Sequence, residues 1–362
     1  MPHNKVFVIG AGASREVNLP VGQELKSQIS SLLNINGAYG SGATLKTGDR
    51  LINSALSAHA NNDIKIHEQL RVEARHTAQS MPLEYSIDSF IESERENEAV
   101  KLCGKLGIVK AILDAERGSL LYATEEQRRL NIINFMNSEN TWYPAFFRLM
   151  TSQCDIAEVV KNFERTTLII FNYDRCVEHY LHTALMVKYR LSSDKAAEHL
   201  NNLKIYHPYG SVGGLPWQNE ENTAAFGGEP TPAQLLSLAD GIKTFTEEAD
   251  EFSDDVIGMR QALAGASQII YLGFAFNGMN MELLNPRKSG VELGPITRKK
   301  IFATRYGISE SNFSYISKTL NIQFEATAYA SATQVDNPKL ESLEGKCADL
   351  FYVFSEALNF PH

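Results

Sequence analysis

The sequence predicts an α/β protein with a parallel sheet and a large helical insertion after its first strand. Short runs rich in Ile, Val, Phe and Tyr alternate with segments of helical character, which is typical of a Rossmann-like parallel sheet. The interval between the first two runs is far longer than an ordinary βαβ connection, which indicates the insertion. The expected strands are Lys5–Ile9, Thr167–Phe171, Leu203–His207, Gln268–Leu272, Lys299–Thr304 and Ile322–Ala326.

We expect one domain over residues 1–362, with the helical insertion as a subdomain at residues 21–160. Within the insertion, Asn36–Asp49 is rich in Gly, Ser and Thr and is expected to be a mobile loop. A second irregular stretch, Gly213–Pro232, is expected to be a surface loop or a lid. The expected helices are Val21–Leu33, Arg50–Ala60, Glu94–Glu116, Glu125–Ser152, Arg175–Lys188 and Lys339–Leu358.

Composition and charge exclude several classes of protein. With 362 residues and 43% hydrophobic content the chain can bury a full core, and its net charge of −9 argues against a general nucleic-acid-binding surface. The four cysteines form no C-x-x-C pair, so neither a structural zinc site nor a disulfide framework is expected. No signal peptide and no apolar run long enough for a membrane helix is visible, which predicts a soluble cytoplasmic protein without membrane association.

The first expected strand leads directly into a glycine-containing turn, Gly10-Ala11-Gly12-Ala13-Ser14, followed by Leu19-Pro20. Two glycines around one small residue let the backbone approach a pyrophosphate, and the following helix can point free N–H groups at the anion. The third glycine of the dinucleotide pattern is replaced by Arg15, and no acidic residue ends a strand about 20 residues later. The motif therefore indicates a nucleotide site, with a plain strand-to-helix turn as the alternative.

The second expected strand ends in Asn172-Tyr173-Asp174. Open α/β sheets bind ligands at the carboxyl ends of their strands, and residues two apart in an extended tip share one side. Asn172 and Asp174 are therefore candidates to face one ribose. The alternative is that Asp174 only caps the helix that follows.

The third and fourth motifs also follow strands. His207 precedes a turn that contains Gly210 and Ser211, and a histidine at such a place can accept a proton near neutral pH. Gly273 and Phe274 follow the fourth expected strand, where a glycine lets a ligand lie against the backbone. The remaining histidines nearby, His179 and His182 on the preceding helix, are expected to be structural.

In this order, the four motifs resemble those of the sirtuin family. The resemblance implies that NAD binds at the strand ends, with His207 as the catalytic histidine, contacting ribose hydroxyls and acting as a base. It also implies that Asn172 and Asp174 lie beside the nicotinamide ribose. The cofactor-binding residues implied are Gly10, Ala11, Gly12, Ala13 and Ser14 at the pyrophosphate, Pro20 near the nicotinamide, Gly210 and Ser211 in the histidine turn, and Gly273 and Phe274 towards the adenosine.

The chain departs from the sirtuin deacylases at several positions. Their zinc ribbon is missing, since no cysteine lies between Cys176 and Cys347, and the Asp-Phe-Arg after their proline is Val21-Gly22-Gln23 here. The chain looks instead like the zinc-free sirtuins of bacterial antiviral defence, found in Thoeris systems and in systems with a HerA-type ATPase. That resemblance implies an NAD hydrolase that depletes cellular NAD in abortive infection, as a homo-oligomer or with an activating partner such as a HerA-type ATPase.

Cleavage of the nicotinamide–ribose bond passes through an oxocarbenium-like state. In this chemistry Asn172 orients the attacking water, Asp174 balances the developing charge or fixes the ribose, and His207 polarises a hydroxyl or the water. Two alternatives stay open. One is ADP-ribosyl transfer to a macromolecule, and the other is a non-catalytic sensor or scaffold that binds NAD or ADP-ribose.

Overall fold

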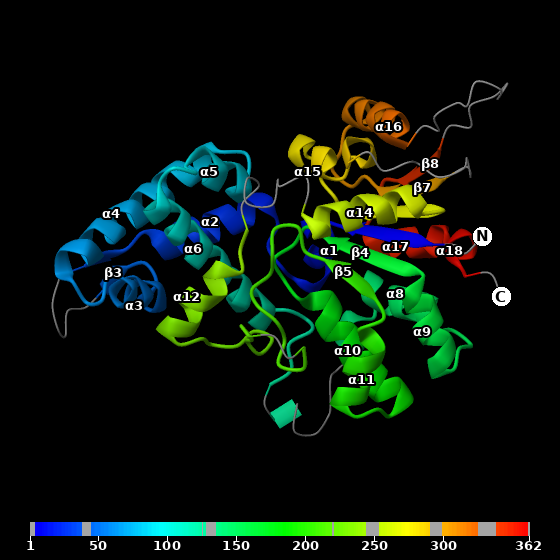
Figure 1. Cartoon of the computed structure of the whole chain (residues 1–362), viewed down its shortest axis with the longest axis horizontal. Helices are drawn as coiled ribbons and strands as arrows, with labels where there is room; N and C mark the ends of the chain where they lie inside the picture. The colour runs from blue at the N-terminus through cyan, green and yellow to red at the C-terminus, as the bar shows by residue number, and fades with distance from the viewer. Residues whose placement is uncertain are drawn as a thin grey trace.

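A six-stranded, all-parallel sheet forms the centre of the molecule in the computed structural model (Figure 1). The structure describes residues 4–37, 45–124, 126–127, 135–218, 221–243, 253–289, 299–324 and 338–360. The strand order β5-β4-β1-β6-β7-β8 is that of a Rossmann-like sheet, 3-2-1-4-5-6 in chain order, which confirms the predicted fold class. The strands are β1 (Lys5–Ile9), β4 (Thr166–Ile170), β5 (Lys204–Tyr206), β6 (Gln268–Leu272), β7 (Lys300–Thr304) and β8 (Lys339–Leu343).

Alternate residues of the strands face two separate hydrophobic cores. Val6 and Val8 of β1 face the core that α14 (Asp254–Gly265) and α16 (Glu310–Phe324) complete. Phe7 and Ile9 face the other core, and helices cover both sheet faces in Figure 1. Burial on both faces explains why the strand sequences are continuously apolar rather than alternating. The helices of the second core are α8 (Trp142–Thr151), α9 (Ile156–Glu164), α10 (Cys176–Tyr189), α11 (Ser193–Leu200) and α17 (Cys347–Val353).

A layer of helices, called here the helical layer, lies beside the sheet, at the left of Figure 1. Its core is continuous with the one under α14. Helix α12 (Pro232–Asp240), from much later in the chain, packs against α3 and α6 of this layer. Residues 21–160 thus contain the earlier elements of this layer, together with α8 and the first part of α9, which cover the sheet. The earlier elements of the layer are α2 (Gly22–Leu33), β2 (Asn36–Gly37), β3 (Leu45–Thr47), α3 (Arg50–His59), α4 (Ile64–Ser80), α5 (Ile87–Ser93) and α6 (Glu98–Arg117).

The last strand was predicted at the wrong place. Ile322–Phe324 end the helix α16, whose buried residues Phe313, Leu320 and Phe324 follow a helical period. The sixth strand is β8, where the helix Lys339–Leu358 was expected to begin. Its sequence, KLESL, consists mainly of good helix formers, but charged residues are typical of a strand at the edge of a sheet. The helices α17 and α18 (Ser355–Leu358) follow it.

Two helices of the helical layer, α4 and α5, lie within the predicted helical insertion, although no helix was named at their positions. The expected helix Glu125–Ser152 is wrong as one element, because a 3₁₀ turn at Phe135–Ser138 precedes α8 and the polar run through Asn140 separates them. Residues 125 and 128–134 of that range lie outside the described residues. The expected loop Asn36–Asp49 contains the short hairpin β2–β3, and residues 38–44 at its centre lie outside the described residues.

Candidate functional site

The strand order brings the four sequence motifs to one edge of the sheet. The glycine turn follows β1, Asn172 to Asp174 follow β4, His207 follows β5 and Gly273 follows β6. The winding direction of the sheet reverses between β1 and β6, and ligands of doubly wound sheets bind beside such a switch point. All four motifs therefore meet where this fold places ligand sites.

The glycines allow the turn after β1 to pack directly on the end of β6. The turn forms α1 (Ala11–Ser14), and the Gly12 amide donates to the Gly273 carbonyl at 3.0 Å. A Cβ on Gly12 would lie 2.8 Å from that oxygen. Gly273 has a φ of +55°, and a Cβ there would lie 2.1 Å from the Ala13 nitrogen. Packing within the protein thus requires these glycines, and the Gly12 amide is already used.

Helix α8 fixes the same turn from the other side. The Trp142 indole donates to the Ala13 carbonyl at 3.0 Å. The Glu16 carboxylate accepts from the backbone amides of Trp142 at 2.9 Å and Ala348 at 3.2 Å. Burial raises the pKa of Glu16, and these amides oppose the shift. The turn is therefore held rigidly.

Asn172 and Asp174 lie together against this turn, and both are buried. The Asn172 amide nitrogen donates to the Ser14 hydroxyl at 2.8 Å and to the Gly10 carbonyl at 3.3 Å. Its amide oxygen is buried without a hydrogen-bond partner. Such an unpaired buried acceptor is costly in a folded protein, and a ligand or water can satisfy it.

The Asp174 carboxylate accepts a hydrogen bond from the Cys176 amide at 3.1 Å. Cys176 is the first residue of α10, so Asp174 binds the first N–H group of this helix, as the capping alternative predicted. Burial raises its pKa, against the opposing hydrogen bonds from Cys176 and Ser14. A carboxyl whose pKa is raised can take up a proton closer to neutral pH than a free aspartate. The Asp174 side chain can therefore take up a proton as well as bind the helix end.

A cavity of about 110 Å³, called here the strand-end cavity, lies between the glycine turn, the β4 end and the helical layer. On the β4 side it is lined by Asn172 and Asp174. On the α5 side it is lined by Asp88, whose carboxylate accepts a hydrogen bond from the Tyr173 hydroxyl and whose pKa burial raises. Cavities on the order of 150 Å³ hold a single benzene-sized ring, so this one has room for at most one small ring and is too small for a dinucleotide. Its lining also includes Ala11, Pro20, Gly22, Leu25, Ser86, Ile87, Ile112 and Phe171.

Both ring nitrogens of His207 have partners. Nδ1 lies 3.2 Å from the Asn172 carbonyl oxygen and Nε2 lies 2.6 Å from a Glu178 carboxylate oxygen. A carbonyl only accepts, so Nδ1 carries a proton. Burial lowers the pKa of His207, but the charge and hydrogen bond of Glu178 outweigh it and the net pKa is raised. Both partners can accept hydrogen bonds, so the raised pKa favours a ring that donates from both nitrogens, and the ring acts as a base only when one of these bonds opens.

The other predicted residues lie near the strand-end cavity without lining it. Gly210 has a φ of +73° in the turn after His207, and a Cβ there would meet the Gly241 carbonyl. Ser211 follows, and the next amide, that of Val212, donates to the Tyr173 carbonyl at 3.1 Å. Phe274 is buried, with its ring 5.2 Å from that of Phe171. Val212 and Phe274 thus contact the residues that follow β4.

Sequence reasoning missed four residues that the structure places around the site. Glu178 lies one helical turn after Asp174, and this spacing was the one signal available for it. Asp88 comes from the helical layer, far away in sequence. Buried Arg175 and Glu116 form an ion pair at 2.6 Å, and Arg175 also donates to backbone carbonyls of the loop after Val212.

A scan of the chain against protein-family models finds no match, and a search of curated proteins finds no similar sequence. Among the described residues, no group of three or more His, Cys, Asp and Glu side chains is arranged to hold a metal ion. Of the helices within the described ranges, none is long and apolar enough to cross a membrane.

Proposed function

We propose that the protein hydrolyses NAD at the nicotinamide–ribose bond and releases nicotinamide and ADP-ribose. One observation carries the proposal: Asn172, whose amide oxygen is unpaired, and Asp174 line the same ring-sized cavity beside the glycine turn. The nicotinamide ring occupies the strand-end cavity, and the ribose lies at its mouth. The resemblance of the four motifs to sirtuins supports the same assignment.

In the reaction, the bond from the ribose carbon to the nicotinamide nitrogen breaks and a bond from the same carbon to a water oxygen forms. The Asn172 oxygen accepts a hydrogen bond from the attacking water and orients it. Ionised Asp174 balances the positive charge of the oxocarbenium-like state and then takes the proton that the water loses, which suits a carboxyl with a raised pKa.

His207 serves as a positioning residue in this proposal. Its imidazolium holds the backbone carbonyl of Asn172, which fixes the orientation of the Asn172 side chain, and Glu178 stabilises the positive charge. This role differs from the base that the family resemblance implies, because both ring nitrogens already donate hydrogen bonds.

The test measures nicotinamide release from NAD by the purified protein, alone and with a candidate ATPase partner. Loss of one positioned polar group commonly costs about 10² to 10³ in rate, so Asn172→Ala and His207→Ala are expected to lose nearly all turnover. Asn312→Ala, at an exposed position on α16, is the matched control and should retain full activity. Turnover like that of the wild type in both site variants would remove this assignment.

A second candidate function is a sensor or scaffold that binds NAD or ADP-ribose without turnover. Both ring nitrogens of His207 and the Gly12 amide already have hydrogen-bond partners within the protein, and this favours binding without catalysis. It predicts saturable binding of NAD without nicotinamide release under any condition. If label from NAD appears instead on a macromolecule, the activity is ADP-ribosyl transfer.

The cellular part of the proposal rests on the family resemblance alone. It is that the enzyme acts in the cytoplasm as a homo-oligomer, with an activator such as a HerA-type ATPase, and depletes NAD during phage infection. Cells that carry the gene should lose NAD after phage challenge, and cells with the Asn172→Ala variant should not.

A further inference from the structure

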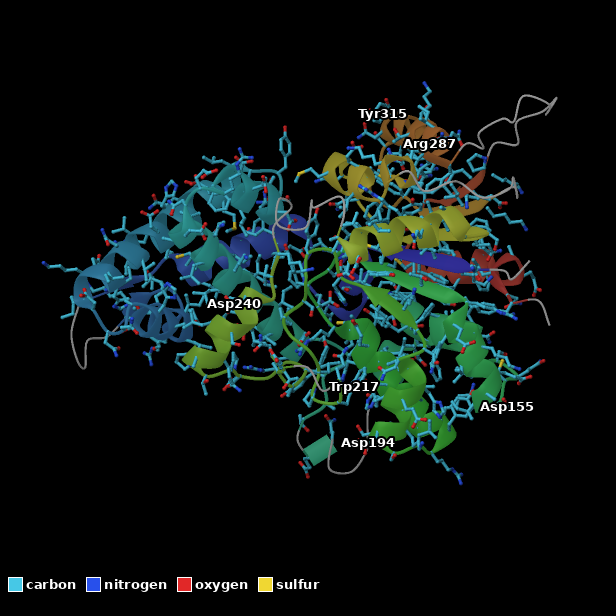
Figure 2. All side chains as sticks on the ribbon, viewed as in Figure 1. Asp155, Asp194, Trp217, Asp240, Arg287 and Tyr315 are labelled. Atoms are coloured by element: carbon cyan, nitrogen blue, oxygen red, sulfur yellow. The ribbon has the colours of Figure 1, made fainter. Side chains whose placement is uncertain are left out.

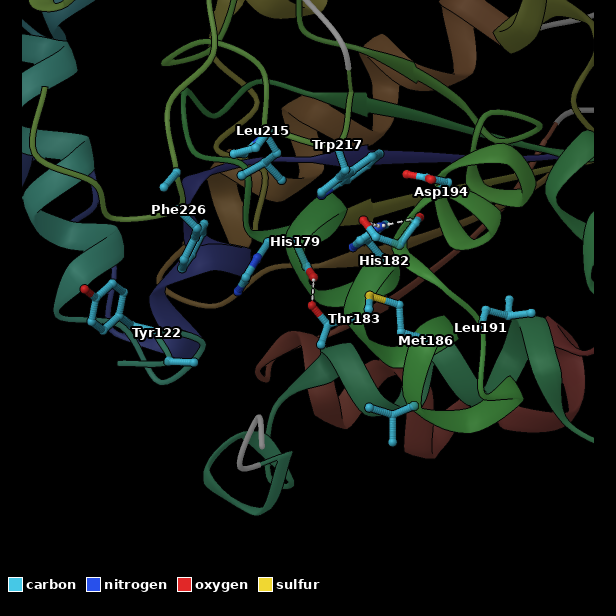
Figure 3. A pocket seen from close by; sticks show the side chains of 15 residues that line it. Tyr122, His179, His182, Thr183, Met186, Leu191, Asp194, Leu215, Trp217 and Phe226 are labelled. Carbon is cyan, nitrogen blue, oxygen red and sulfur yellow. Dashed lines mark hydrogen bonds between the residues drawn. The ribbon is translucent and has the colours of Figure 1, made fainter. Parts of the chain in front are cut away.

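A larger cavity, of about 550 Å³, lies on the outer face of α10, between this helix, the start of α11 and the loop around Trp217 (Figure 3). We call it the α10 pocket. It shares no lining residue with the strand-end cavity. Trp217 and Asp194 mark its position beside α10 and α11 in Figure 2. Its volume falls within the roughly 300–1,000 Å³ of ordinary small-molecule sites.

Two stacked pairs of rings form much of the wall. The His182 ring lies 4.3 Å from the Trp217 ring with an angle of 3° between their planes. The His179 ring lies 4.0 Å from the Phe226 ring with an angle of 6°. Because each ring is held by its partner, the aromatic surface is formed before any ligand arrives, and binding costs little side-chain entropy.

The loop that carries these aromatic residues is anchored. Arg175 donates to the carbonyls of Ala224 at 2.6 Å and Ala225 at 3.2 Å, beside Phe226. The same guanidinium donates to the Gly214 carbonyl at 3.2 Å, next to Leu215. The buried ion pair with Glu116 holds the guanidinium in place. These hydrogen bonds fix the position of the loop that forms this wall of the pocket.

His182 gives the pocket an oriented hydrogen-bond acceptor. Its Nε2 lies 3.1 Å from the Ser193 carbonyl oxygen, so Nε2 carries the proton. Burial lowers the pKa of His182, against the opposing effect of that carbonyl, which keeps the ring neutral at physiological pH. The neutral tautomer leaves Nδ1 as an acceptor.

The charges of the residues that line the pocket disfavour the binding of a phosphate group. Asp194 is an acidic residue at the pocket, and none of the described residues that line it is Lys or Arg. A phosphate group would have no cation to pair with and would meet the carboxylate of Asp194. A neutral or cationic ring has no such penalty.

We propose that the α10 pocket binds a small planar heterocycle that carries N–H donors and no phosphate, such as nicotinamide or the adenine ring of adenosine. The ring packs against the aromatic side chains, and one N–H donates to Nδ1 of His182. This proposal is independent of NAD hydrolysis at the strand-end cavity.

The test is calorimetric titration of the full chain with nicotinamide, adenosine and AMP. We expect saturable binding of nicotinamide or adenosine, and at least tenfold weaker binding of AMP than of adenosine. His182→Leu is expected to weaken binding about tenfold, which corresponds to about 1.4 kcal/mol. Val187→Trp should abolish it, because Val187 lines the pocket, is 50% exposed and can be enlarged without filling the core. Tyr352→Leu, an 85% exposed aromatic elsewhere, is the control and should bind normally.

Absence of saturable binding of both heterocycles to the wild type would overturn the proposal. So would unchanged affinity in Val187→Trp. Nicotinamide that binds only in the strand-end cavity would keep its affinity in Val187→Trp and lose it in Asn172→Ala, and that pattern also contradicts the proposal. None of these outcomes decides whether the protein hydrolyses NAD, which the release assay measures separately.

Discussion

The strand-end cavity and the α10 pocket differ in what forms their walls. The strand-end cavity is small and contains polar groups that are buried, hydrogen-bonded or unpaired, with carboxyl pKa values raised by burial. The α10 pocket has about five times the volume and is walled by stacked rings, with one oriented acceptor. Chemistry requires desolvated polar groups at fixed positions, whereas recognition of a flat ligand requires area. Volume alone would therefore not have identified the strand-end cavity, where we propose that the reaction takes place.

The largest expected effect concerns the buried pair Glu116–Arg175, which anchors the loop of the α10 pocket. Glu116→Ala leaves an uncompensated buried guanidinium, which commonly costs about 3–5 kcal/mol of unfolding free energy. We expect this loss in urea unfolding, together with faster proteolysis in the loop around Trp217, because Arg175 holds the carbonyls of that loop.

The matched control is Glu229→Ala. Glu229 also pairs with an arginine, Arg117, at 2.5 Å, but its side chain is 81% exposed. Such pairs contribute less than about 1 kcal/mol. Equal losses in the two variants would show that the buried pair is no special anchor of the α10 pocket.

A substitution in the glycine turn is expected to have a smaller effect, and to change ligand binding at the strand-end cavity but not at the α10 pocket. Gly12→Ala forces a Cβ against the backbone of Gly273, and overpacking of this kind costs about 1–3 kcal/mol. We expect lower stability and weaker NAD binding at the strand-end cavity, with unchanged adenosine binding at the α10 pocket. Gly265→Ala at the end of α14, where a Cβ meets open space, should be neutral or slightly stabilising. Loss of adenosine affinity in Gly12→Ala would mean that the two cavities are coupled.

The smallest effect concerns pH and the His207–Glu178 pair. The pKa of His207 is raised in the folded protein, so the pair stabilises fully below the unfolded value of about 6.5 and loses its effect as pH rises through the folded value. Glu178→Gln should therefore cost more unfolding free energy at about pH 6 than at about pH 9, with a difference on the order of 1 kcal/mol since Gln still accepts a hydrogen bond. A deficit that does not change with pH would contradict the imidazolium assignment.

The sequence predicted the parts of the molecule that local patterns determine. Continuous apolar runs located β1, β4 and β6 closely, and turn chemistry placed Asn172 and Asp174 at a strand end. It failed where the pattern was ambiguous. The run Ile322–Ala326 alternates like a strand, yet Phe324 is buried by the helical period that begins with Phe313.

The sequence could not predict contacts between residues that are far apart along the chain. Asp88 reaches Tyr173, and Glu116 reaches Arg175, only because the helical layer folds back onto the β4 end. His179 and His182 were expected to be structural, and the structure shows them stacked on aromatic rings of a loop more than 30 residues later. The spacing of residues along one helix does not indicate which distant residues they will contact.

The position of β1 at the centre of the sheet affects how the chain is made. This strand pairs with Thr166–Ile170 on one side and with Gln268–Leu272 on the other, so its second partner is synthesised long after it. At typical translation rates the delay is roughly ten seconds to a minute. During that time the helical layer can form many of its own local contacts, whereas one edge of the apolar strand β1 stays unpaired even after β4 has been made. This inner strand is thus exposed to aggregation on the ribosome, and we expect its protection by chaperones to affect the yield of folded protein.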